Sequence, residues 1–505
     1  MNRARDTMPT GVPPLIRALL DPQRYAGDVG AVELLETHIS WVLLAGGFAY
    51  KIKKPLKLPF LDFSTLERRH YCCLEELRLN RRFSPDIYLG VVGIFHTPED
   101  PRWEGAAPPI EYAVQMQRFD GANRLDRVCA RGQLQAAHLT ELAHALCAFQ
   151  AQAAIAEASS HFGVVGDYLA LVRDNFHDLR LALPQREDQL RLQALQAWSE
   201  TQFTALSPLL VARRESGHVR EGHGDLHLAN LVLINQHVRM FDCIEFNAQL
   251  RWLDVADEMA FTYMDLVAHQ QPGLANGFID DMLGCTGDYE AARVLRFFAV
   301  YRALVRAKVA AIRMQEGQED ATAARAVIAL AERLAAPAPK RLIITHGLSG
   351  CGKTHATTQL LQADPLAATV RIRSDVERKR LFGLAAAAHR ETSAQAGIYA
   401  PRVNTLTYAR LLRLGDMLLQ AGGTVIVDAT FLRHADRQAF RALANQAGAR
   451  FEILAPVATP AQLTERIEAR RAAGHDASDA TLDVLAHQLQ TLEPLTPDER
   501  RLQVP

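Results

Sequence analysis

A short stretch in the middle of the chain carries residues suited to phosphoryl transfer. It reads His223-Gly-Asp225-Leu-His-Leu-Ala-Asn230, and a second acid, Asp242, follows twelve residues after Asn230. One carboxylate can take or orient the proton of an acceptor hydroxyl, while an amide oxygen and a second carboxylate can hold magnesium on the phosphates of ATP. We therefore predict Asp225 as the catalytic base and Asn230 with Asp242 as metal ligands.

A predicted strand upstream supplies a lysine that can reach the phosphates. Residues 45–47 predict a tight turn, and residues 48–54 the returning strand. Because side chains alternate along a strand, Ala49, Lys51 and Lys53 share one face. The small Ala49 leaves room for an adenine. Lys51 is therefore the predicted ATP-binding lysine, with Lys53 as the alternative; a basic edge strand that discourages aggregation is the non-functional interpretation.

The order H-G-D-x-x-x-x-N followed by Asp resembles the aminoglycoside phosphotransferase family, which has the protein-kinase-like fold with H-G-D in place of H-R-D. The strand at 48–54 similarly resembles the V-A-I-K strand of kinases. No G-x-G-x-x-G precedes this strand, which departs from protein kinases, so the polar turn Thr37–Ser40 is expected to cover the phosphates. In this family the histidine of H-G-D braces the loop, which implies a structural role for His223 and similarly for His227.

The resemblance gives a role to a helix predicted at residues 63–83. Leucines and a tyrosine form its apolar stripe, and the helix carries Glu75-Glu76. A kinase-like lobe needs one glutamate here to pair with the strand lysine and hold it forward. We choose Glu76 for this role, with Glu75 as the alternative.

Two further segments, 87–95 and 110–116, are predicted as paired strands. The second runs into residues 117–121, which in the resembling fold form the hinge where backbone groups read the adenine edge. Met116 is then the residue on the gatekeeper side. From residue 134 the apolar spacing becomes helical, and helical patterns continue at 168–183 and 190–213.

Several acids follow Asp242. Glu245, Asp254, Asp257 and Glu258 can assist magnesium or a cationic substrate, or they can cap the helix that begins near Asp254, and we favour capping. They are also the residues that hint at an acidic pocket for a polycationic acceptor. The arginines of residues 294–314 are interpreted as a solvated face.

A second nucleotide motif follows an Ala/Pro-rich linker at residues 334–340. After a predicted strand at 341–346, residues 347–354 read G-L-S-G-C-G-K-T, a complete Walker A motif. Its glycines let backbone N–H groups surround a phosphate at a helix N-terminus. Lys353 is predicted to reach the β- and γ-phosphates and Thr354 to meet magnesium, while the presence of Cys351 is interpreted as incidental. The residues predicted to bind ATP in this loop are Gly347, Ser349, Gly350, Cys351, Gly352, Lys353 and Thr354.

The strands that follow the Walker motif alternate with helices. They are predicted at 370–375, 424–430 and 451–454, with a helix at 403–419, and this alternation indicates an open parallel sheet. Ligands bind at the carboxyl ends of such strands, where Asp375, Asp428 and Thr430 fall.

The segment from Ser374 to Arg378 resembles small P-loop kinases of the polynucleotide-kinase and gluconate-kinase kind. This resemblance implies that Asp375 receives the acceptor hydroxyl and that Asp428 holds the magnesium water shell. Arg466 and Arg470 are assigned to a lid whose guanidinium charge stabilises the transferring phosphoryl group. Pairing with Glu465 and Glu468 on the helix surface is the alternative.

Composition limits the remaining classes. The chain has 505 residues, 49% of them hydrophobic, with 56 basic against 57 acidic residues and a net charge of −1. This balance argues against nucleic-acid or membrane-surface binding. Seven scattered cysteines, with no C-x-x-C pair, favour a reducing compartment. With no apolar leader and no apolar run of membrane-spanning length, the chain is predicted to be cytoplasmic.

The predicted architecture has two parts. Residues 1–335 form an α+β, two-lobed, protein-kinase-like domain of the aminoglycoside phosphotransferase type, with an N-lobe at 1–118 and a helical lobe at 119–335. Residues 340–505 form an α/β P-loop NTPase domain with a parallel sheet. The arrangement resembles bacterial bifunctional aminoglycoside phosphotransferase/ATP-binding proteins.

The predicted function is ATP- and Mg²⁺-dependent phosphorylation of a hydroxyl on a small-molecule acceptor that the sequence does not identify. The alternative is a nucleotide-binding regulatory protein in which one domain is a non-catalytic module or switch. "Aminoglycoside" is here a family label and not an inference about the substrate.

Overall fold

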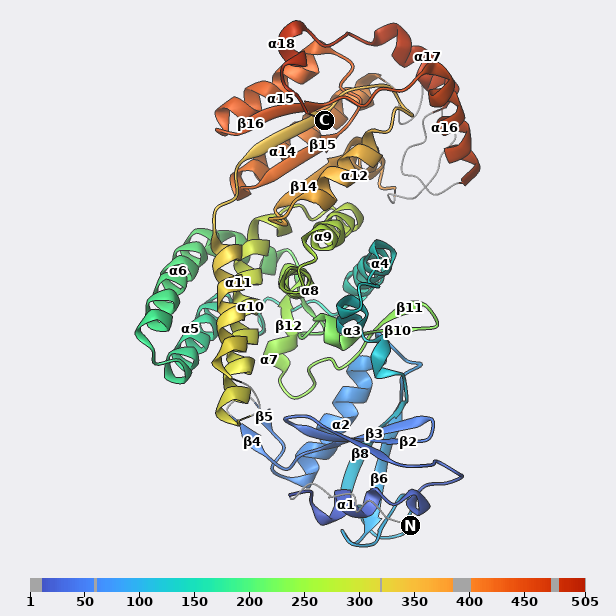
Figure 1. Cartoon of the computed structure of the whole chain (residues 1–505), viewed down its shortest axis with the longest axis vertical. Helices are drawn as coiled ribbons and strands as arrows, with labels where there is room; N and C mark the ends of the chain where they lie inside the picture. Colours follow the sequence, from blue (N-terminus) through green and yellow to red (C-terminus); the bar gives the residue numbers. More distant parts are fainter. Residues whose placement is uncertain (1–10, 59–60, 318–319, 385–400, 474–480, 505) are drawn as a thin grey trace, which may run out of the picture. The chain divides into compact units, whose positions relative to one another are not determined.

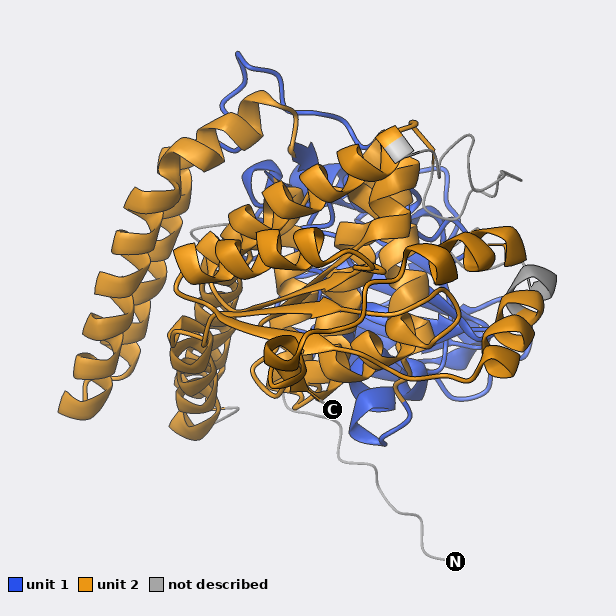
Figure 2. Ribbon diagram, turned by 90° about the horizontal axis from the view of Figure 1, so that it is seen from above, with its two compact units in different colours: residues 1–133, 153–163, 219–253 blue, residues 134–152, 164–218, 254–505 orange. Residues whose placement is uncertain are grey.

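The computed structural model describes residues 11–58, 61–317, 320–384, 401–473 and 481–504, with the backbone alone for residues 401 and 470–473. The chain divides into two compact units (Figure 2). Residues 1–133, 153–163 and 219–253 form unit 1, and residues 134–152, 164–218 and 254–505 form unit 2. Helical segments of the first predicted domain thus fall in the same unit as the P-loop region. The predicted domain boundaries remain a prediction.

Unit 1 contains an antiparallel sheet and the segment that carries the H-G-D motif (Figure 1). Its described helices are α1 (Pro14–Leu19), α2 (Leu66–Asn80), α3 (Leu125–Ala130) and α7 (Ala248–Arg251), with short 3₁₀ turns including η3 (Leu228–Asn230). Its described strands are β1 (Glu33–Glu36), β2 (Ser40–Ala45), β3 (Phe48–Lys53), β4 (Lys57–Leu58), β5 (Leu61–Asp62), β6 (Tyr88–His96), β7 (Pro101–Arg102), β8 (Glu111–Gln117), β9 (Val219–Glu221), β10 (Leu231–Ile234), β11 (His237–Met240) and β12 (Trp252–Asp254), at whose end unit 2 resumes.

The main sheet of unit 1 has the order β1-β2-β3-β8-β6-β7. Alternation along β3 sends Ile52 into a core with Ile16 and Leu19 of α1, while Ala49 faces a second core with Cys73 of α2 and Met116. The predicted lysine face of β3 therefore lies on the side of the sheet that packs against α2. Thr65 caps α2 by accepting a hydrogen bond from Arg68 N.

The H-G-D segment of unit 1 runs from β9 through η3 into the hairpin β10–β11, which pairs Leu231 with Met240. Phe241 N donates to Asn230 O at 3.0 Å, which closes the base of this hairpin. The hairpin therefore brings Asn230 and Asp242 to the same end, although twelve residues separate them.

Unit 2 contains a helical part and the P-loop part. Its described helices are α4 (Ala136–Gln152), α5 (Val165–Ala182), α6 (Arg186–Glu215), α8 (Val255–Ala268), α9 (Pro272–Thr286), α10 (Ala291–Gln315), α11 (Ala321–Ala335), α12 (Lys353–Ala363), α13 (Ser374–Arg380), α14 (Pro401–Ala421), α15 (His434–Gln446), α16 (Pro460–Ala473), α17 (Leu482–Thr491) and α18 (Pro497–Arg500). Its described strands after β12 are β13 (Arg341–Thr345), β14 (Thr369–Arg373), β15 (Thr424–Asp428), β16 (Arg450–Leu454) and β17 (Gln503–Val504).

The strands of the P-loop part form one parallel sheet with the order β14-β15-β13-β16-β17. The central strand β13 is fully apolar inside, with Leu342, Ile343 and Ile344 buried, as expected for a parallel strand covered on both faces. The Walker loop follows β13 directly, and Asp428 ends the neighbouring β15. The predicted α/β class of this region is confirmed.

The predicted kinase-like elements of the first region are also present, with modest shifts at their ends. The helix predicted at 63–83 spans Leu66–Asn80, and the predicted strand pair appears as β6 and β8 in antiparallel register. The short strand β1 was not predicted, because its sequence Glu-Leu-Leu-Glu has the composition of a helix. Among the described residues, no helix combines the length and the apolar character needed to cross a membrane.

Candidate functional site

Two lysines and three carboxylates form a buried cluster in unit 1. Lys51 Nζ donates to Glu76 Oε1 at 2.8 Å and to Asp242 Oδ1 at 2.5 Å. Lys53 Nζ donates to Glu76 Oε2 at 2.7 Å and also contacts Glu245 Oε1. The strand lysine and the helix glutamate therefore lie together as predicted, and both candidate lysines share the same carboxylate.

The charges in this cluster hold one another ionised. Burial works against the charge of Lys51, yet Asp242 and Glu76 raise the pKa of Lys51 well above its ordinary value. Burial would also protonate Glu76, but the two lysines lower the pKa of Glu76 to about 2. Burial raises the pKa of Glu245, and the neighbouring carboxylate of Glu76 raises it further, although Lys53 acts in the opposite direction. Lys51 and Glu76 thus form a charged pair at neutral pH.

Asp242 is held by its backbone as well as by Lys51. Its φ is +62°, in the left-handed region that aspartate tolerates better than most residues. Asp242 N donates to the Tyr88 hydroxyl at 3.0 Å, and the next residue, Cys243, donates its N–H to Asn80 Oδ1 at 2.9 Å. The Asp242 side chain remains 44% exposed, so a ligand can reach it.

Asp225 and Asn230 meet directly across their loop. Asn230 Nδ2 donates to Asp225 O at 2.9 Å and to Asp225 Oδ2 at 3.1 Å, and His227 Nε2 lies 3.3 Å from the same Oδ2. The Asp225 side chain is 36% exposed, so an acceptor can approach it. The amide nitrogen of Asn230 faces Asp225. Its side-chain oxygen, Oδ1, is therefore the atom that could bind a metal.

His223 connects the two ends of this loop. Its Nε2 lies 2.8 Å from Phe241 O and its Nδ1 accepts from Asp225 N at 3.3 Å. A carbonyl oxygen can only accept, so the imidazole proton is on Nε2 and the ring is neutral. Gly224 has a φ of +87°, and a Cβ there would lie 2.9 Å from Leu250 O. Both neighbours of the motif's acid are thus fixed by local geometry.

The donor set of this loop fits a magnesium ion whose remaining ligands are water and phosphate. Within the described ranges, no group of three or more His, Cys, Asp or Glu side chains could by itself hold a metal ion. Mg²⁺ commonly takes one or two protein oxygens and completes its shell with water and substrate phosphates. The oxygens of Asn230 and Asp242 match that pattern, so their assignment as metal ligands is chemically reasonable and remains a prediction.

The two elements predicted to surround the nucleotide are present near β3. Met116 is 7% exposed and pairs in register with Ala49, so the small residue and the gatekeeper-side residue are neighbours. Thr37 Oγ1 donates to Ser40 O at 3.0 Å and accepts from Ser40 N at 2.9 Å, which closes the turn. Binding of adenine or phosphate by these residues stays a prediction.

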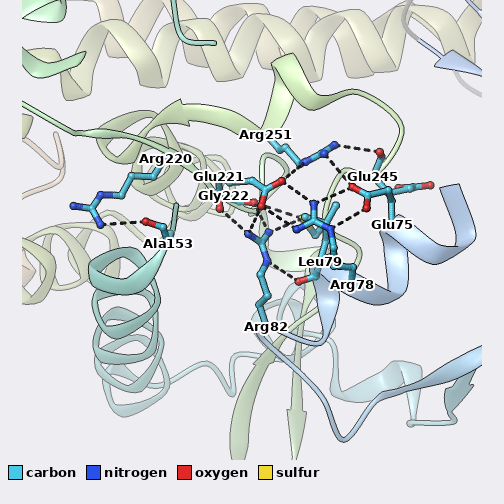
Figure 3. A network of polar contacts seen from close by, with 11 residues as sticks. Glu75, Arg78, Leu79, Arg82, Ala153, Arg220, Glu221, Gly222, Glu245 and Arg251 are labelled. Carbon is cyan, nitrogen blue, oxygen red and sulfur yellow. Dashed lines mark hydrogen bonds and ion pairs between the residues drawn. The ribbon is translucent and has the colours of Figure 1, made fainter. Parts of the chain in front are cut away.

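A network of ion pairs that the sequence did not suggest joins α2 to the H-G-D segment (Figure 3). Glu221, two residues before His223, accepts from Arg78 at 2.8 Å, from Arg82 at 3.1 Å and from Arg251 at 3.1 Å. Arg82 also donates to Gly222 O at 3.0 Å. Three guanidinium groups therefore fix the strand that leads into the H-G-D loop.

Glu75 extends this network to the lysine cluster. It accepts from Arg78 at 2.8 Å and from Arg251 at 3.2 Å, while Arg251 also donates to Glu245 O at 3.2 Å. The adjacent glutamates of α2 thus have different tasks, because Glu76 faces the lysines and Glu75 faces the arginines. A buried lysine at a strand position is the signal that could have suggested an acidic partner such as Glu245.

The other acids after Asp242 do not form an open pocket. Asp254 caps α8 by accepting from Ala256 N, as predicted, and it also binds Arg213 at 2.8 Å. Asp257 is 1% exposed and pairs with Arg302 at 2.6 Å, so Arg302 does not belong to a solvated arginine face as interpreted from the sequence. The hint of an acidic acceptor pocket is therefore wrong for these residues.

The Walker loop of unit 2 has the expected backbone shape. Gly347, Gly350 and Gly352 have φ values of +144°, +85° and +97°, which only glycine adopts readily. Lys353 Nζ donates to Leu348 O at 2.7 Å, so the lysine side chain folds back over the loop. Cys351 is 5% exposed and packs against Leu463, Ile467 and Leu485 beneath the loop. It therefore has a packing role and is not incidental.

The predicted magnesium residues of the P-loop part touch each other. Thr354 Oγ1 donates to Asp428 Oδ2 at 2.8 Å. Asp375 lies in the first turn of α13, just after β14, with its side chain 28% exposed and 3.8 Å from Arg378. The order β14-β15-β13 thus places Asp375, Asp428 and the loop at the same edge of the sheet.

The far side of the Walker loop is held by the C-terminal helices. Gln488 of α17 accepts from Ser349 N at 2.8 Å and donates to Ser349 Oγ at 3.0 Å, a contact that the sequence did not suggest. Arg466 of α16 donates to Gly350 O at 3.3 Å, so one predicted lid arginine reaches the loop. The side chain of Arg470 lies outside the described residues, so the lid stays a prediction.

Comparisons with known proteins bear on the family of this chain. Residues 342–495 match the family model described as "AAA domain", which confirms the predicted P-loop class of this region. The chain is 30% identical over 461 residues to the Uncharacterized protein Rv2004c of Mycobacterium tuberculosis, a match that covers 91% of this chain and 90% of that protein. The Uncharacterized protein Mb2027c of Mycobacterium bovis matches to the same extent. The chain belongs to the family of these mycobacterial proteins.

Solved kinases are also similar to this chain. A choline/ethanolamine kinase family protein from Mesorhizobium loti has 11% identity and a TM-score of 0.40, covering 61% of this chain and 89% of its own. A choline kinase from Cryptosporidium parvum has 13% identity and a TM-score of 0.41, covering 63% and 94%. An aminoglycoside 2′-phosphotransferase IIIa in complex with GDP has 12% identity and a TM-score of 0.41, covering 63% and 97%. With TM-scores below 0.5, these likenesses do not bear on the substrate.

Proposed function

We propose that this protein is an ATP-dependent phosphotransferase that phosphorylates a hydroxyl group of a small molecule in the cytoplasm. Its first site is the loop around Asp225 with the cluster around Lys51. Its second site is the Walker loop at 347–354 with Asp428 and Asp375. The two sites serve separate acceptors in this proposal.

One observation carries the proposal for the first site. Lys51 of β3, Glu76 of α2 and Asp242 form one hydrogen-bonded set, although 191 residues separate Lys51 from Asp242. The hairpin β10–β11 links this set to Asn230, which in turn contacts Asp225. A phosphate clamp, a carboxylate and amide for a metal, and an exposed carboxylate are the parts that phosphoryl transfer uses.

Each residue of the first site has a distinct task. Asp225 accepts the proton of the acceptor hydroxyl through its exposed carboxylate, and Asn230 holds that carboxylate in place through Nδ2. Lys51, kept forward by Glu76, exchanges Asp242 for phosphate oxygens when ATP binds. Magnesium on Asn230 and Asp242 would neutralise charge on the phosphates. Water is excluded below the lysines, because Lys53 and Glu76 are fully buried.

In the second site, the backbone of the Walker loop binds the phosphates at the N-terminus of α12. Lys353 leaves Leu348 O to reach the β- and γ-phosphates, and the pair of Thr354 and Asp428 would hold the metal and its water shell. Asp375 accepts the proton of the second acceptor. Arg466, already at the loop through Gly350 O, supplies positive charge near the transferred group.

The acids that follow Asp242 in the sequence favour an acceptor that is not a polycation. Asp254 and Asp257 are 1% exposed, and each is paired with an arginine. Glu245 is 4% exposed and is paired with Lys53. A polycationic acceptor needs unpaired surface carboxylates, so we propose a neutral or singly charged alcohol instead.

A second candidate function is a regulatory protein in which the first site binds without turnover. The observation that favours it is the ion pair of Lys51 with Asp242, since a carboxylate of the chain itself competes with phosphate for the lysine. In this case only the P-loop site would consume ATP, and the first site would act as a binding module.

The test is a screen of metabolite extracts with γ-labelled ATP, using the full chain and the single variants Asp225→Asn and Lys353→Ala. Asp225→Asn changes one oxygen to an amide group, and Lys353→Ala removes an ammonium that donates to Leu348 O and Cys351 Sγ. Both variants should therefore fold. Circular dichroism of each variant provides the control.

We expect each variant to lose one labelled product and to keep the other. If Asp225→Asn leaves every product unchanged while Lys353→Ala removes all of them, the first site is the idle module. If neither variant changes ATP consumption, the proposed function is wrong.

A further inference from the structure

Helix α9 of unit 2 presents one face to the P-loop part of the same unit. Gly273, Asn276, Asp280 and Gly284 recur at helical spacing along this face. A Cβ at Gly273 would lie 2.3 Å from Gln362 O, the carbonyl of a residue in α12. The backbone of α9 therefore lies so close to the Walker helix that a side chain at position 273 has no room.

Asn276 binds the connection between the Walker helix and the edge strand of the parallel sheet. Its Nδ2 donates to Leu361 O at 2.9 Å, and its Oδ1 accepts from Thr369 N at 3.3 Å. The side chain is 1% exposed. Both polar atoms of a buried amide are thus used to fix α12 and β14 on α9, which is a costly arrangement to disturb.

The next residue along this face makes a charged contact. Asp280 accepts from Arg371 Nε at 3.2 Å and from Nη2 at 2.6 Å, a two-pronged pair in which Arg371 is 8% exposed. The third nitrogen of the guanidinium, Nη1, donates to Thr354 O at 3.3 Å, Thr357 Oγ1 at 3.1 Å and Thr358 Oγ1 at 2.8 Å. One side chain of β14 therefore joins α9 to the first turn of α12.

This contact lies next to the predicted magnesium residues. Thr354, whose carbonyl oxygen is bound by Arg371, is the residue whose hydroxyl donates to Asp428 at 2.8 Å. Burial works against the charge of Arg371, yet the carboxylates of Asp280 and then of Asp428 raise the pKa of Arg371 above its ordinary value. The guanidinium of Arg371 is therefore a permanent positive charge close to Thr354 and Asp428.

We propose that Asp280 and Arg371 are positioning residues of the P-loop site. Asp280 fixes the plane of the guanidinium, and the guanidinium fixes Thr354 so that its hydroxyl faces Asp428, the residue with which it would hold a metal ion. The inference rests on the nucleotide binding that the proposed function assigns to this loop. What is new is that Asp280, a residue of α9 outside the P-loop part, sets the orientation of the predicted magnesium residues of the loop.

The test is the magnesium dependence of ATP binding by the full chain. A fluorescent ATP analogue is titrated at a series of Mg²⁺ concentrations, and the signal that Lys353→Ala removes is the binding at the Walker loop. Asp280→Asn keeps the size of the side chain and removes its charge. The matched control is Asp281→Asn, one residue along α9, whose carboxylate accepts from Thr140 Oγ1 at 2.6 Å on another face.

We expect Asp280→Asn to raise the Mg²⁺ concentration needed for half-maximal binding by about fivefold or more, within the usual range for coupled sites. Arg371→Lys, which keeps the charge but cannot bind Asp280 and α12 together, should change it in the same direction. Asp281→Asn should change it much less, because Asp281 acts on Arg371 through its charge and, among the described residues, makes no hydrogen bond to it.

A purely structural role would look different. Asp280→Asn would then lower the melting temperature, but its ATP binding would depend on Mg²⁺ in the same way as that of the control Asp281→Asn. This result would overturn the inference. Absence of any Lys353-dependent binding would overturn both the inference and the P-loop part of the proposed function. Binding without turnover would contradict only the proposed phosphoryl transfer, because the Mg²⁺ dependence of binding still decides the role of Asp280.

Discussion

The two candidate sites hold their lysines in opposite ways. Lys51 is bound by the carboxylates of Glu76 and Asp242, which come from distant parts of the chain. Lys353 instead lies on the carbonyl oxygen of Leu348, five residues before it in the same loop. The first site is assembled from charged side chains, whereas the second is assembled from the backbone of one short loop.

In the first site, a substitution that lowers turnover should therefore also lower local stability. In the second site, it should lower turnover with little loss of stability. Lys51 and Glu76 are buried and depend on each other, so a change in one leaves the other uncompensated. The backbone shape of the Walker loop depends on glycines and on packing beneath the loop, and much less on its lysine. The predictions below test whether the two sites differ in this way.

The largest effects are expected from replacing each lysine by methionine. Lys51→Met and Lys353→Met should each lower the turnover of their own site by roughly 10²–10³-fold, because each removes a charge that binds the transferred phosphates. Only Lys51→Met should also destabilise its unit, by about 3 kcal/mol, since Glu76 and Asp242 lose a buried partner. Hydrogen exchange of β3 and α2 peptides measures the local stability.

The control for this comparison is the hydrogen exchange of α12 in Lys353→Met. The lysine hydrogen-bonds to a single backbone carbonyl oxygen, so the loss of stability there should stay below about 1 kcal/mol. Equal destabilisation by the two substitutions would remove the distinction between the sites.

A smaller effect is expected from Glu221→Gln in the arginine network of unit 1. The amide cannot balance the charges of Arg78, Arg82 and Arg251, so β9 and α2 should loosen by about 1–3 kcal/mol. Turnover at the first site should fall about tenfold as Asp225 loses its fixed position, and P-loop turnover should not change. Steady-state kinetics on both labelled products measure this.

Glu33→Gln provides the matched control for Glu221→Gln. Glu33 pairs with Arg118 at 2.7 Å, but its side chain is 57% exposed, and such surface pairs contribute less than about 1 kcal/mol. If both substitutions affect turnover equally, the network does not position the loop.

The pH dependence of the lysine cluster gives a third comparison. The lysines lower the pKa of Glu76 from 4.5 to about 2, so its contribution to stability is complete above pH 4.5 and is lost as the pH falls toward 2. Hydrogen exchange of α2 in wild type and Glu76→Gln should therefore differ most above pH 4.5 and converge below it. A difference that grew as the pH fell would contradict the ion pairs described here.

The smallest effect concerns the cysteines of the two units. A hydrogen bond from Cys147 lowers the pKa of the exposed Cys285 in unit 2 to about 6, whereas burial raises the pKa of Cys72 to about 11 in unit 1. The thiolate of Cys285 therefore dominates above pH 6, and alkylation by iodoacetamide should level off just above it. Peptide mass spectrometry measures this, with Cys285→Ser as the control. A midpoint near 9 would contradict the lowered pKa.

The sequence predicted the P-loop site more fully than the first site. The reason is again that the P-loop site is built from one local segment, whereas the first site is built from distant side chains. The Walker loop is a local backbone structure, so the glycines, Lys353 and Thr354 are readable from their spacing alone. The sheet order that brings Asp428 to Thr354 follows from the alternation of strands and helices. The contact of Gln488 with Ser349 could not be predicted, because nothing in a helix of ordinary composition indicates which loop it covers.

The first site depended on pairing between distant residues. Strand alternation gave the shared face of Lys51 and Lys53, and the resemblance gave the choice of Glu76. Glu245 was noticed as an acid, but its burial against Lys53 follows only from the path of the chain after Asp242. The network around Glu221 was missed because Arg78 and Arg82, at the end of α2, lie far along the chain from Glu221 and Arg251.

One backbone feature has a practical consequence for protein engineering. Asp242 has a left-handed main chain at φ +62°, a conformation that costs most L-residues roughly 1–2 kcal/mol and that asparagine accepts readily. An alanine at this position would therefore strain the hairpin as well as delete the carboxylate, and the two losses could not be told apart. Asparagine would keep the fold of the chain and change only its charge, which makes it the cleaner choice for an inactive reference protein.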